Sequence, residues 1–143
     1  MAKKPEARFS ARIVKNLQGF YIDRIESRVG LGIPDMFLTC KTTGKILAIE
    51  NKAVTRGLKV PLRPHQVSYL LSRAMVGAPV YVLVLHKKEG EAVGRVCLYS
   101  GADAEVLTKE GLRLKPLAEW ADNKIAWHRL GYILMSGNHS DMP

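Results

Sequence analysis

Apolar residues recur every three or four positions in three stretches of the chain, a spacing that places them on one side of a helix. The stretches cover residues 5–18, 64–76 and about 122–135. Proline suits the first turn of a helix and aspartate suits the position just before it, so Pro5, Pro64 and Asp122 mark three helix starts. We therefore predict one helix in each stretch.

Between these stretches, short apolar runs have the composition of β-strands and are bounded by glycine, proline or charged residues. The runs cover residues 20–25, 35–40, 45–52, 79–85 and 95–99. The run 79–85 is apolar on both faces, as in a strand at the centre of a sheet. The polar, basic segment between Lys52 and Pro64 is expected to be a loop. Residues 106–117 are expected to form an edge strand or an irregular cover.

Helices that alternate with strands in this way predict an α/β fold. A helix between the runs 45–52 and 79–85 fits the crossover that joins two parallel strands. We predict a mixed sheet of about five strands flanked by helices, in a single domain of 143 residues. Its core would cover about residues 5–100, followed by a helical extension over about 101–135 and a tail over 136–143.

Two of the strand runs flank a polar break and have the sequence pattern of a β-hairpin. If residues 41–44 form the loop, Cys40 faces Lys45, and counting back along both strands makes Asp35 face Glu50. Any loop of even length keeps Asp35 on the face of Glu50 and Lys52, because side chains alternate along a strand. Directly opposed residues have Cβ atoms roughly 4.5–5.5 Å apart, so the two carboxylates are expected to meet.

This meeting of two acids and a lysine at the end of an apolar hairpin suggests a metal site. Mg²⁺ uses one or two carboxylates together with water and phosphate oxygens, and buried charges need such a partner. The simpler alternative is a polar Asp35 at the start of a strand and an exposed ion pair between Glu50 and Lys52. Apolar neighbours on both faces of the hairpin favour the metal site.

The chain is strongly basic, since 22 Lys and Arg against 13 Asp and Glu give a formal net charge of +9. Such a surplus favours a polyanionic partner, most often nucleic acid, although it also serves solubility. The overall positive charge would attract the phosphates of such a partner. A metal ion held by the acidic site would then contact them locally.

Several other kinds of site and location are disfavoured. The sequence has no Gly-rich phosphate loop, no Cys/His metal spacing and no Gly-x-Ser-x-Gly motif, and its histidines lack partner patterns. Cys40 and Cys97 lie within predicted strands and are expected to be buried, reduced thiols. Because no membrane span or signal peptide is apparent, we expect an intracellular protein with no membrane partner and no organic cofactor.

Pro34-Asp35 followed by Glu50-Asn51-Lys52 resembles the PD-(D/E)xK motif of metal-dependent nucleases. The resemblance implies a resolvase-like core and hydrolysis of DNA with Mg²⁺ or Mn²⁺, leaving a 5′-phosphate and a 3′-hydroxyl. Asp35 and Glu50 would hold the cation. Lys52 would orient the attacking water or stabilise the charge that builds on the phosphate in the transition state.

Two further similarities extend the match to roughly residues 5–86. Glu6 in the first predicted helix, followed by a glycine and a strand, is similar to archaeal Holliday-junction resolvases. This implies that Glu6 is an additional acid of the metal site; its alternative role is interaction with the helix dipole. Glu26, after the first strand, is a second candidate for the additional acid.

The segments 32–35 and 63–66 are similar to the VRR-NUC branch and to related phage nucleases. In that branch a glutamine lies near the lysine of the metal site, which implies a catalytic role for Gln66. The alternative is that Gln66 only supports the start of its helix.

Basic side chains from several segments are expected to contact nucleic acid, because Lys and Arg contacts with phosphate supply most of the non-specific affinity. They are Lys3, Lys4, Arg8 and Arg12 at the first helix, Arg24 and Arg28 near the first strand, and Arg56, Lys59 and Arg63 in the loop. For the helix residues, a simple solvated face is the alternative.

A compact basic domain without a separate sequence-reading module argues against a sequence-specific restriction enzyme. We predict a structure-selective endonuclease for branched DNA, acting on four-way junctions as a homodimer. A flap or single-strand nicking nuclease of the VRR-NUC type is the second expectation. A different class of protein is a basic nucleic-acid-binding module without catalysis, for which an Asp35→Asn variant would have no metal-dependent cutting to lose.

Overall fold

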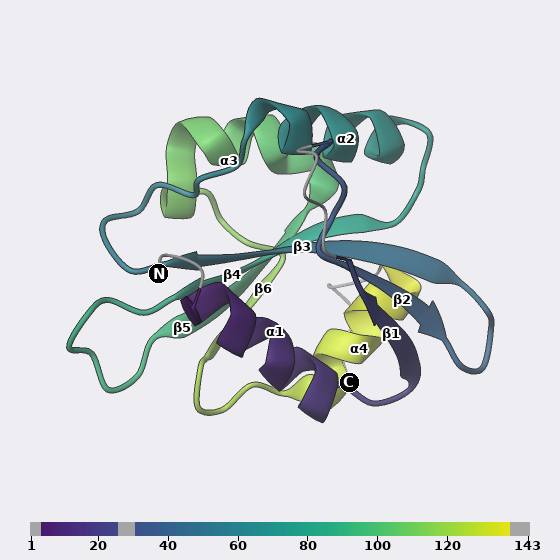
Figure 1. Cartoon of the computed structure of the whole chain (residues 1–143), viewed down its shortest axis with the longest axis horizontal. Coiled ribbons are helices and arrows are strands. Elements are labelled where there is room, and N and C mark those ends of the chain that lie inside the picture. The colour runs from purple at the N-terminus through teal and green to yellow at the C-terminus, as the bar shows by residue number, and fades with distance from the viewer. Residues whose placement is uncertain (1–3, 26–30, 138–143) are drawn as a thin grey trace.

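Six strands of the described chain form one sheet, in which they lie side by side in the order of the sequence (Figure 1). The computed structural model describes residues 4–25 and 31–137, except for the side chain of Lys4. The strands are β1 (Phe20–Arg24), β2 (Met36–Cys40), β3 (Ile46–Val54), β4 (Val80–His86), β5 (Arg95–Ser100) and β6 (Ala118–Ala121). The pair β3–β4 is parallel and the other neighbouring pairs are antiparallel. The predicted α/β class with a mixed sheet is confirmed.

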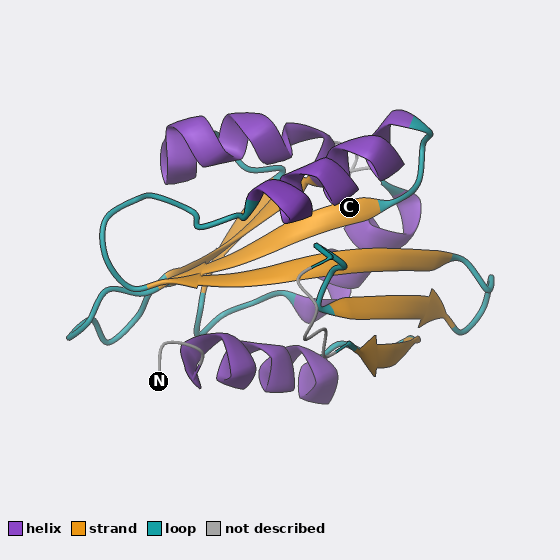
Figure 2. Ribbon diagram, turned by 45° about the horizontal axis from the view of Figure 1, so that its top comes forward, coloured by secondary structure: helices purple, strands orange, loops and turns teal. Residues whose placement is uncertain are grey.

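Helices cover both faces of the sheet, which gives three layers (Figure 2). They are α1 (Lys4–Asn16), α2 (Pro64–Met75), α3 (Ala104–Glu110) and α4 (Trp127–Ser136), with the short 3-10 turns η1 (Gly101–Asp103) and η2 (Gly111–Arg113). Helices α1 and α4 pack on one face, and α2 and α3 on the other (Figure 1). Helix α2 joins β3 to the parallel β4, as predicted for the crossover. None of the described helices is long and apolar enough to cross a membrane.

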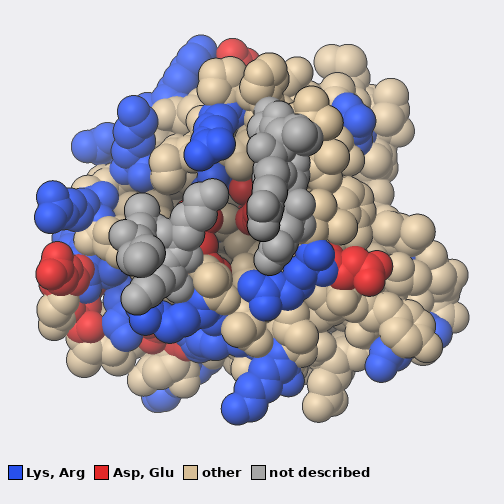
Figure 3. Space-filling model, viewed as in Figure 1, with Lys and Arg blue, Asp and Glu red and all other residues tan. Residues whose placement is uncertain are grey.

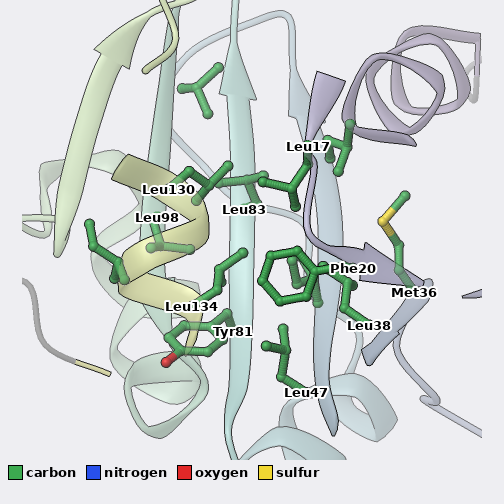
Figure 4. Packing of buried hydrophobic residues seen from close by; sticks show 14 of the residues in the cluster. Leu17, Phe20, Met36, Leu38, Leu47, Tyr81, Leu83, Leu98, Leu130 and Leu134 are labelled. Atoms are coloured by element: carbon green, nitrogen blue, oxygen red, sulfur yellow. The ribbon is translucent and has the colours of Figure 1, made fainter. Parts of the chain in front are cut away.

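Alternate residues of the central strands fill two separate hydrophobic cores. Leu47 and Leu83 belong to the core under α1 and α4 (Figure 4), whereas Ala48 belongs to the core under α2 and α3. Cys40 and Cys97 are buried in these cores as free thiols, as predicted. Because both faces of β3 are covered, polar side chains that project from it are buried as well.

The β2–β3 hairpin has the predicted register. Met36 pairs with Ile49, and the backbone N–H of Cys40 donates to the carbonyl of Lys45 at 2.8 Å. Gly44, with a φ of 75°, closes the turn, and its N–H donates back to the Cys40 carbonyl at 2.9 Å. The loop is therefore even in length, as the predicted acidic pair requires.

The prediction of an edge strand or irregular cover over residues 106–117 is wrong for residues 106–110, which are helical, whereas residues 111–117 form a 3-10 turn and irregular structure. Helix α3 forms at its start, with Ala104 and Leu107 buried on the α2 side of the sheet. In η2, Gly111 packs against the backbone of Leu58. A helix of seven residues is too short to show a clear periodicity. The strand β6 follows and pairs with β5, which makes six strands where about five were expected.

The last helix begins later than expected, at Trp127, with Ala126 as its N-cap. Asp122, the predicted N-cap, is buried. Its carboxylate lies 3.8 Å from Lys87 Nζ, and its backbone N–H donates to the carbonyl of Gly94. The local preference of aspartate for helix starts is outweighed by these partners, which are distant in the sequence.

The loop expected directly after Lys52 also begins later. Strand β3 continues to Val54, which pairs with His86 of β4 and is buried. An apolar residue beside a central strand extends the ladder, even though the composition of the following segment is polar and basic.

Candidate active site

Asp35 and Glu50 lie opposite each other where the β2–β3 hairpin ends, one step beyond the last pair of its ladder. Asp35 Oδ2 accepts a hydrogen bond from the backbone N–H of Asn51 at 2.8 Å, which holds the Asp35 side chain over β3. Because side chains alternate along a strand, Glu50 and Lys52 project from the same face of β3. That face is the one covered by α2.

The Glu50 carboxylate is contacted by one residue of its own strand and one of α2. Lys52 Nζ lies 3.5 Å from Glu50 Oε2, and the side-chain amide of Gln66 donates to the same oxygen at 3.0 Å. Gln66 Oε1 in turn accepts from the backbone N–H of Arg63 at 2.9 Å, at the start of α2. Gln66 therefore supports its helix and also reaches the acidic pair, so the geometry is compatible with both roles considered for it.

Glu50 occupies an unfavourable place for a negative charge. It is 2% exposed, and its Oε1 has no hydrogen-bond partner among the described residues. Burial, followed by the charge of Asp35, raises the pKa of Glu50 to about 8, against the opposing effect of Lys52. A divalent cation between the two acids would relieve their repulsion.

Glu6 approaches this region from the α1 layer. It lies in the first turn of α1, is half-buried, and its charge contributes to the raised pKa of Glu50. Within residues 4–25 and 31–137, no three Asp, Glu, His or Cys side chains are grouped closely enough to hold a metal ion on their own. The structure thus brings Asp35 and Glu50 together, with Glu6 near them. The alternative acid Glu26 lies outside the described residues.

Asn51 contributes to the site, although its position in the sequence predicted no role for its side chain. Its side chain is fully buried and donates to Ser10 Oγ of α1 at 3.1 Å, while its backbone N–H donates to Asp35. Asn51 thus connects α1, β3 and the acidic pair. The sequence does show a polar Ser10 after Phe9, and a polar Asn51 between Ile49 and Ala53 on one face of a strand. Their contact, however, depends on how α1 packs on the sheet.

Basic side chains surround the acidic atoms at the centre of the face shown in Figure 3. Arg56, Lys59 and Arg63 are exposed on the segment between β3 and α2. Arg24 is exposed at the end of β1. These positions are compatible with the predicted contacts to phosphate.

Arg8 and Arg12 of α1 line a hollow of about 390 Å³ at the end of β3, together with Lys87 and Lys88. Arg12 also donates to the backbone carbonyl of Asp122, so part of its role is structural. Glu89, Glu91 and Asp122 line the hollow as well, so it carries charges of both signs. Three predicted contacts lie outside the described atoms, namely Lys3, Arg28 and the side chain of Lys4.

The side chains present fit a hard divalent cation. Asp35 and Glu50 supply carboxylate oxygens, and the buried Glu50 Oε1 accepts no hydrogen bond from the part of the chain that the structure describes. Mg²⁺ and Mn²⁺ favour such oxygens and complete their coordination with water or phosphate.

No protein-family model matches the chain, and no curated protein has a matching sequence. Among solved structures, the chain is similar to Hjc, a Holliday junction resolvase from the archaeal hyperthermophile Archaeoglobus fulgidus. The two chains are 22% identical, and the match covers 68% of this chain and 74% of the resolvase with a TM-score of 0.45. At this level of similarity, the function of the chain has to be inferred from its own residues.

Proposed function

We propose that the protein is a metal-dependent endonuclease that hydrolyses phosphodiester bonds in DNA. One observation carries the proposal: Asp35 and Glu50 face each other at the end of a buried hairpin, and Lys52 Nζ lies 3.5 Å from the Glu50 carboxylate. A buried acidic pair destabilises the fold unless a partner compensates it. Perturbed acids of this kind cluster at functional sites. The same three residues form the motif that resembles PD-(D/E)xK nucleases.

Asp35 and Glu50 would hold Mg²⁺ or Mn²⁺, and Glu6 would help to place that ion or a second one. When bound, the cation polarises the scissile phosphate and lowers the pKa of a water molecule. Glu50 must be ionised to act as a ligand, whereas burial favours its protonated form. Loading of the site therefore releases a proton, and metal affinity increases with pH up to about 8.

Lys52 would contact the attacking water or the phosphate, whereas Gln66 would hold the Glu50 carboxylate in place. The Lys52 side chain is 8% exposed, so its ammonium group acts in a poorly solvated place, where it can orient the attacking water or stabilise charge on the phosphate. Gln66 donates to Glu50 Oε2, and the carboxylate would still have Oε1 free of hydrogen bonds from the described residues with which to help hold a cation. Water adds to phosphorus, the bond to the 3′ oxygen breaks, and the proton lost by water neutralises that oxygen. The products are a 5′-phosphate and a 3′-hydroxyl.

Branched DNA is the substrate that we propose first. The net charge of +9 and the cations of α1 and of the β3–α2 segment favour a phosphate backbone without selecting a base sequence. Symmetric cutting of a four-way junction requires two active sites, and we expect a homodimer to supply them.

A flap or single-strand nicking nuclease is the second candidate, favoured by the hydrogen bond from Gln66 to Glu50. The resemblance to the VRR-NUC branch implies a glutamine near the lysine of the metal site, and Gln66 donates to the same Glu50 oxygen that Lys52 Nζ approaches.

The test is cleavage of a labelled four-way junction, a flap and a matched linear duplex, each with Mg²⁺, with Mn²⁺ and with chelator. We expect metal-dependent cutting by the wild type, no cutting by Asp35→Asn, and a loss of at least about a hundredfold for Lys52→Met, which keeps the volume of the side chain. Asp23→Asn, an exposed acid on β1, serves as the control and should cut normally.

A second readout does not depend on activity. Mn²⁺ should raise the melting temperature of the wild type and of Asp23→Asn, but not of Asp35→Asn, because only a ligand that prefers the folded state stabilises it. Paired symmetric nicks in the junction would support the dimeric resolvase, and cutting confined to the flap would support the second candidate. Absence of cutting under every metal condition, with DNA binding intact, would leave a basic binding module and refute the nuclease.

A further inference from the structure

A groove beside the acidic pair has a lining unlike that of the basic surfaces around it. This groove, called the Tyr69 groove here, measures about 620 Å³. Ile25, Leu31, Ile33 and Phe37 line it from the β1–β2 side, and Tyr69 and Arg73 line it from α2. A mostly apolar lining with few polar groups, in a space of roughly 300–1,000 Å³, is typical of sites for small molecules or for parts of larger ones.

Tyr69 and Arg73 form a stacked platform on one side of the groove. They are four positions apart on α2, which places them on one face of the helix. The guanidinium carbon of Arg73 lies 3.8 Å from the centroid of the Tyr69 ring. Tyr69 is half-buried and Arg73 is exposed, so the platform is both anchored and accessible.

The opposite side of the groove presents apolar side chains to solvent. Leu31 is 62% exposed and Ile25 is 37% exposed. Together with the stacked platform, these side chains make a slot with apolar walls and one planar cation. Such a slot suits a flat ring that is attached to a negatively charged backbone.

The Tyr69 groove lies next to the acidic pair, since residues that line it neighbour Asp35 and Gln66 in the chain. Phe37 follows Asp35 by two positions and therefore projects from the same face of the sheet. His65, which also lines the groove, directly precedes Gln66, the residue that donates to Glu50. A strand whose phosphate is held at Asp35 and Glu50 would thus have a neighbouring base within reach of the groove.

We propose that the Tyr69 groove binds an unpaired nucleobase of the DNA strand that passes the acidic pair. The proposal rests on the proposed nuclease function for the identity of the ligand. Unpaired bases stack on aromatic rings and on guanidinium planes, whereas bases within a duplex are already stacked and paired. The groove would therefore select substrates with unpaired nucleotides, such as flaps, bulges or opened junctions.

The test measures binding without divalent cations, so that it does not depend on cleavage. The probes are a flap substrate and a matched fully paired duplex, each with one 2-aminopurine. In the flap substrate it replaces an unpaired nucleobase of the flap, and in the duplex it replaces the equivalent paired nucleobase. Titration is followed by anisotropy and by 2-aminopurine fluorescence. The variants are Tyr69→Leu, which removes the ring, Tyr69→Phe, which keeps it, and Arg73→Lys, which keeps the charge but not the planar group.

We expect Tyr69→Leu and Arg73→Lys to bind the flap at least about fivefold more weakly, with little change for the paired duplex. Tyr69→Phe should bind the flap as the wild type does. The control is Tyr21→Leu, which removes a more exposed tyrosine that also carries a cation over its ring, Lys41 at 5.1 Å. Tyr21→Leu should leave both affinities unchanged, because Tyr21 does not line the groove.

Equal flap affinity for the wild type and Tyr69→Leu would overturn the proposal, as would an equal loss for the flap and the duplex. The two hypotheses fail separately. Cleavage that persists while Tyr69→Leu binds the flap normally would refute the groove and keep the nuclease. Flap binding that depends on Tyr69, in a protein that cuts nothing, would keep the groove and refute the nuclease.

Discussion

Glu50 is the residue at which fold stability and the proposed chemistry oppose each other most directly. Its carboxyl group is buried, lies opposite Asp35, is affected by the charge of Glu6, and is contacted by Lys52 and Gln66. These surroundings raise its pKa to about 8, so without a cation the folded protein favours the neutral form near neutral pH. If Glu50 holds a metal ion as proposed, it does so at the expense of stability.

The change Glu50→Gln tests this opposition. The pKa of Glu50 is about 8 in the folded protein and 4.5 as its ordinary value, so between these values the folded state holds a proton that the unfolded chain lacks. Stability must then fall as pH rises through this window. Urea unfolding in the presence of chelator measures the effect. Between about pH 5 and pH 9, we expect the unfolding free energy of the wild type to fall by on the order of 2–4 kcal/mol more than that of Glu50→Gln.

The control for this series is Glu105→Gln, an exposed acid that pairs with Lys109 on α3. Its pH dependence should match that of the wild type. If the unfolding free energies of the wild type and Glu50→Gln changed with pH in parallel, the idea would be wrong. Glu50 would then ionise in the folded protein as readily as in the unfolded chain.

At the level of secondary-structure elements, the site depends on how the segment before β2 meets the start of α2. Gly32 has a φ of 77°, and a Cβ at this position would overlap the backbone carbonyl of His65. Leu31 and Ile33, on either side of Gly32, line the Tyr69 groove together with His65, so the close approach also shapes that groove. Glycine is needed here for the space as well as for the backbone angle.

Two alanine substitutions separate these requirements. Gly32 and Gly44 both have positive φ, but nothing lies within 4 Å of a Cβ at Gly44. Gly44→Ala should lose about 1–2 kcal/mol of unfolding free energy from the left-handed conformation alone. Gly32→Ala should lose at least about 2 kcal/mol more, because the backbone of α2 must move. Urea unfolding measures both, and equal losses would mean that the segment does not pack on α2 as described.

At the level of the whole molecule, charge and sheet topology combine. The net charge is +9, yet the acids Asp35 and Glu50 lie together at one end of the β2–β3 hairpin, with Glu6 near them. Lys and Arg side chains surround acidic atoms at the centre of the face shown in Figure 3. Phosphate would be attracted by the general charge and retained at the acidic pair by a cation.

The salt dependence of DNA binding measures this general attraction. Each lost phosphate contact reduces the slope of log affinity against log salt concentration by about one. We expect this reduction for Arg8→Ala, which removes a cation from the hollow at the end of β3. Lys109→Ala, an equally charged change on α3, should leave the slope as it is. Equal salt-dependence slopes for the wild type and Arg8→Ala would mean that DNA does not contact Arg8.

Much of the hairpin was predictable from local patterns. The meeting of Asp35 and Glu50 follows from the alternation of side chains and from a loop of even length, both of which are properties of one short segment. The burial of β4 follows from its apolar residues on both faces. The resemblance to PD-(D/E)xK nucleases uses the same local residues, so it adds a chemical interpretation without adding spatial information.

The remaining features depend on contacts between segments that are far apart in the chain. Gln66 reaches Glu50 because α2 crosses over the sheet, and Ser10 reaches Asn51 because α1 packs beneath it. The burial of Asp122 and the short helix α3 contradict their local patterns for the same reason. Periodicity records which way a side chain points, whereas the distance between two segments is set by the packing of the layers. The hairpin could therefore be read from the amino-acid order, but the partners of its acids and the Tyr69 groove became visible only in the folded chain.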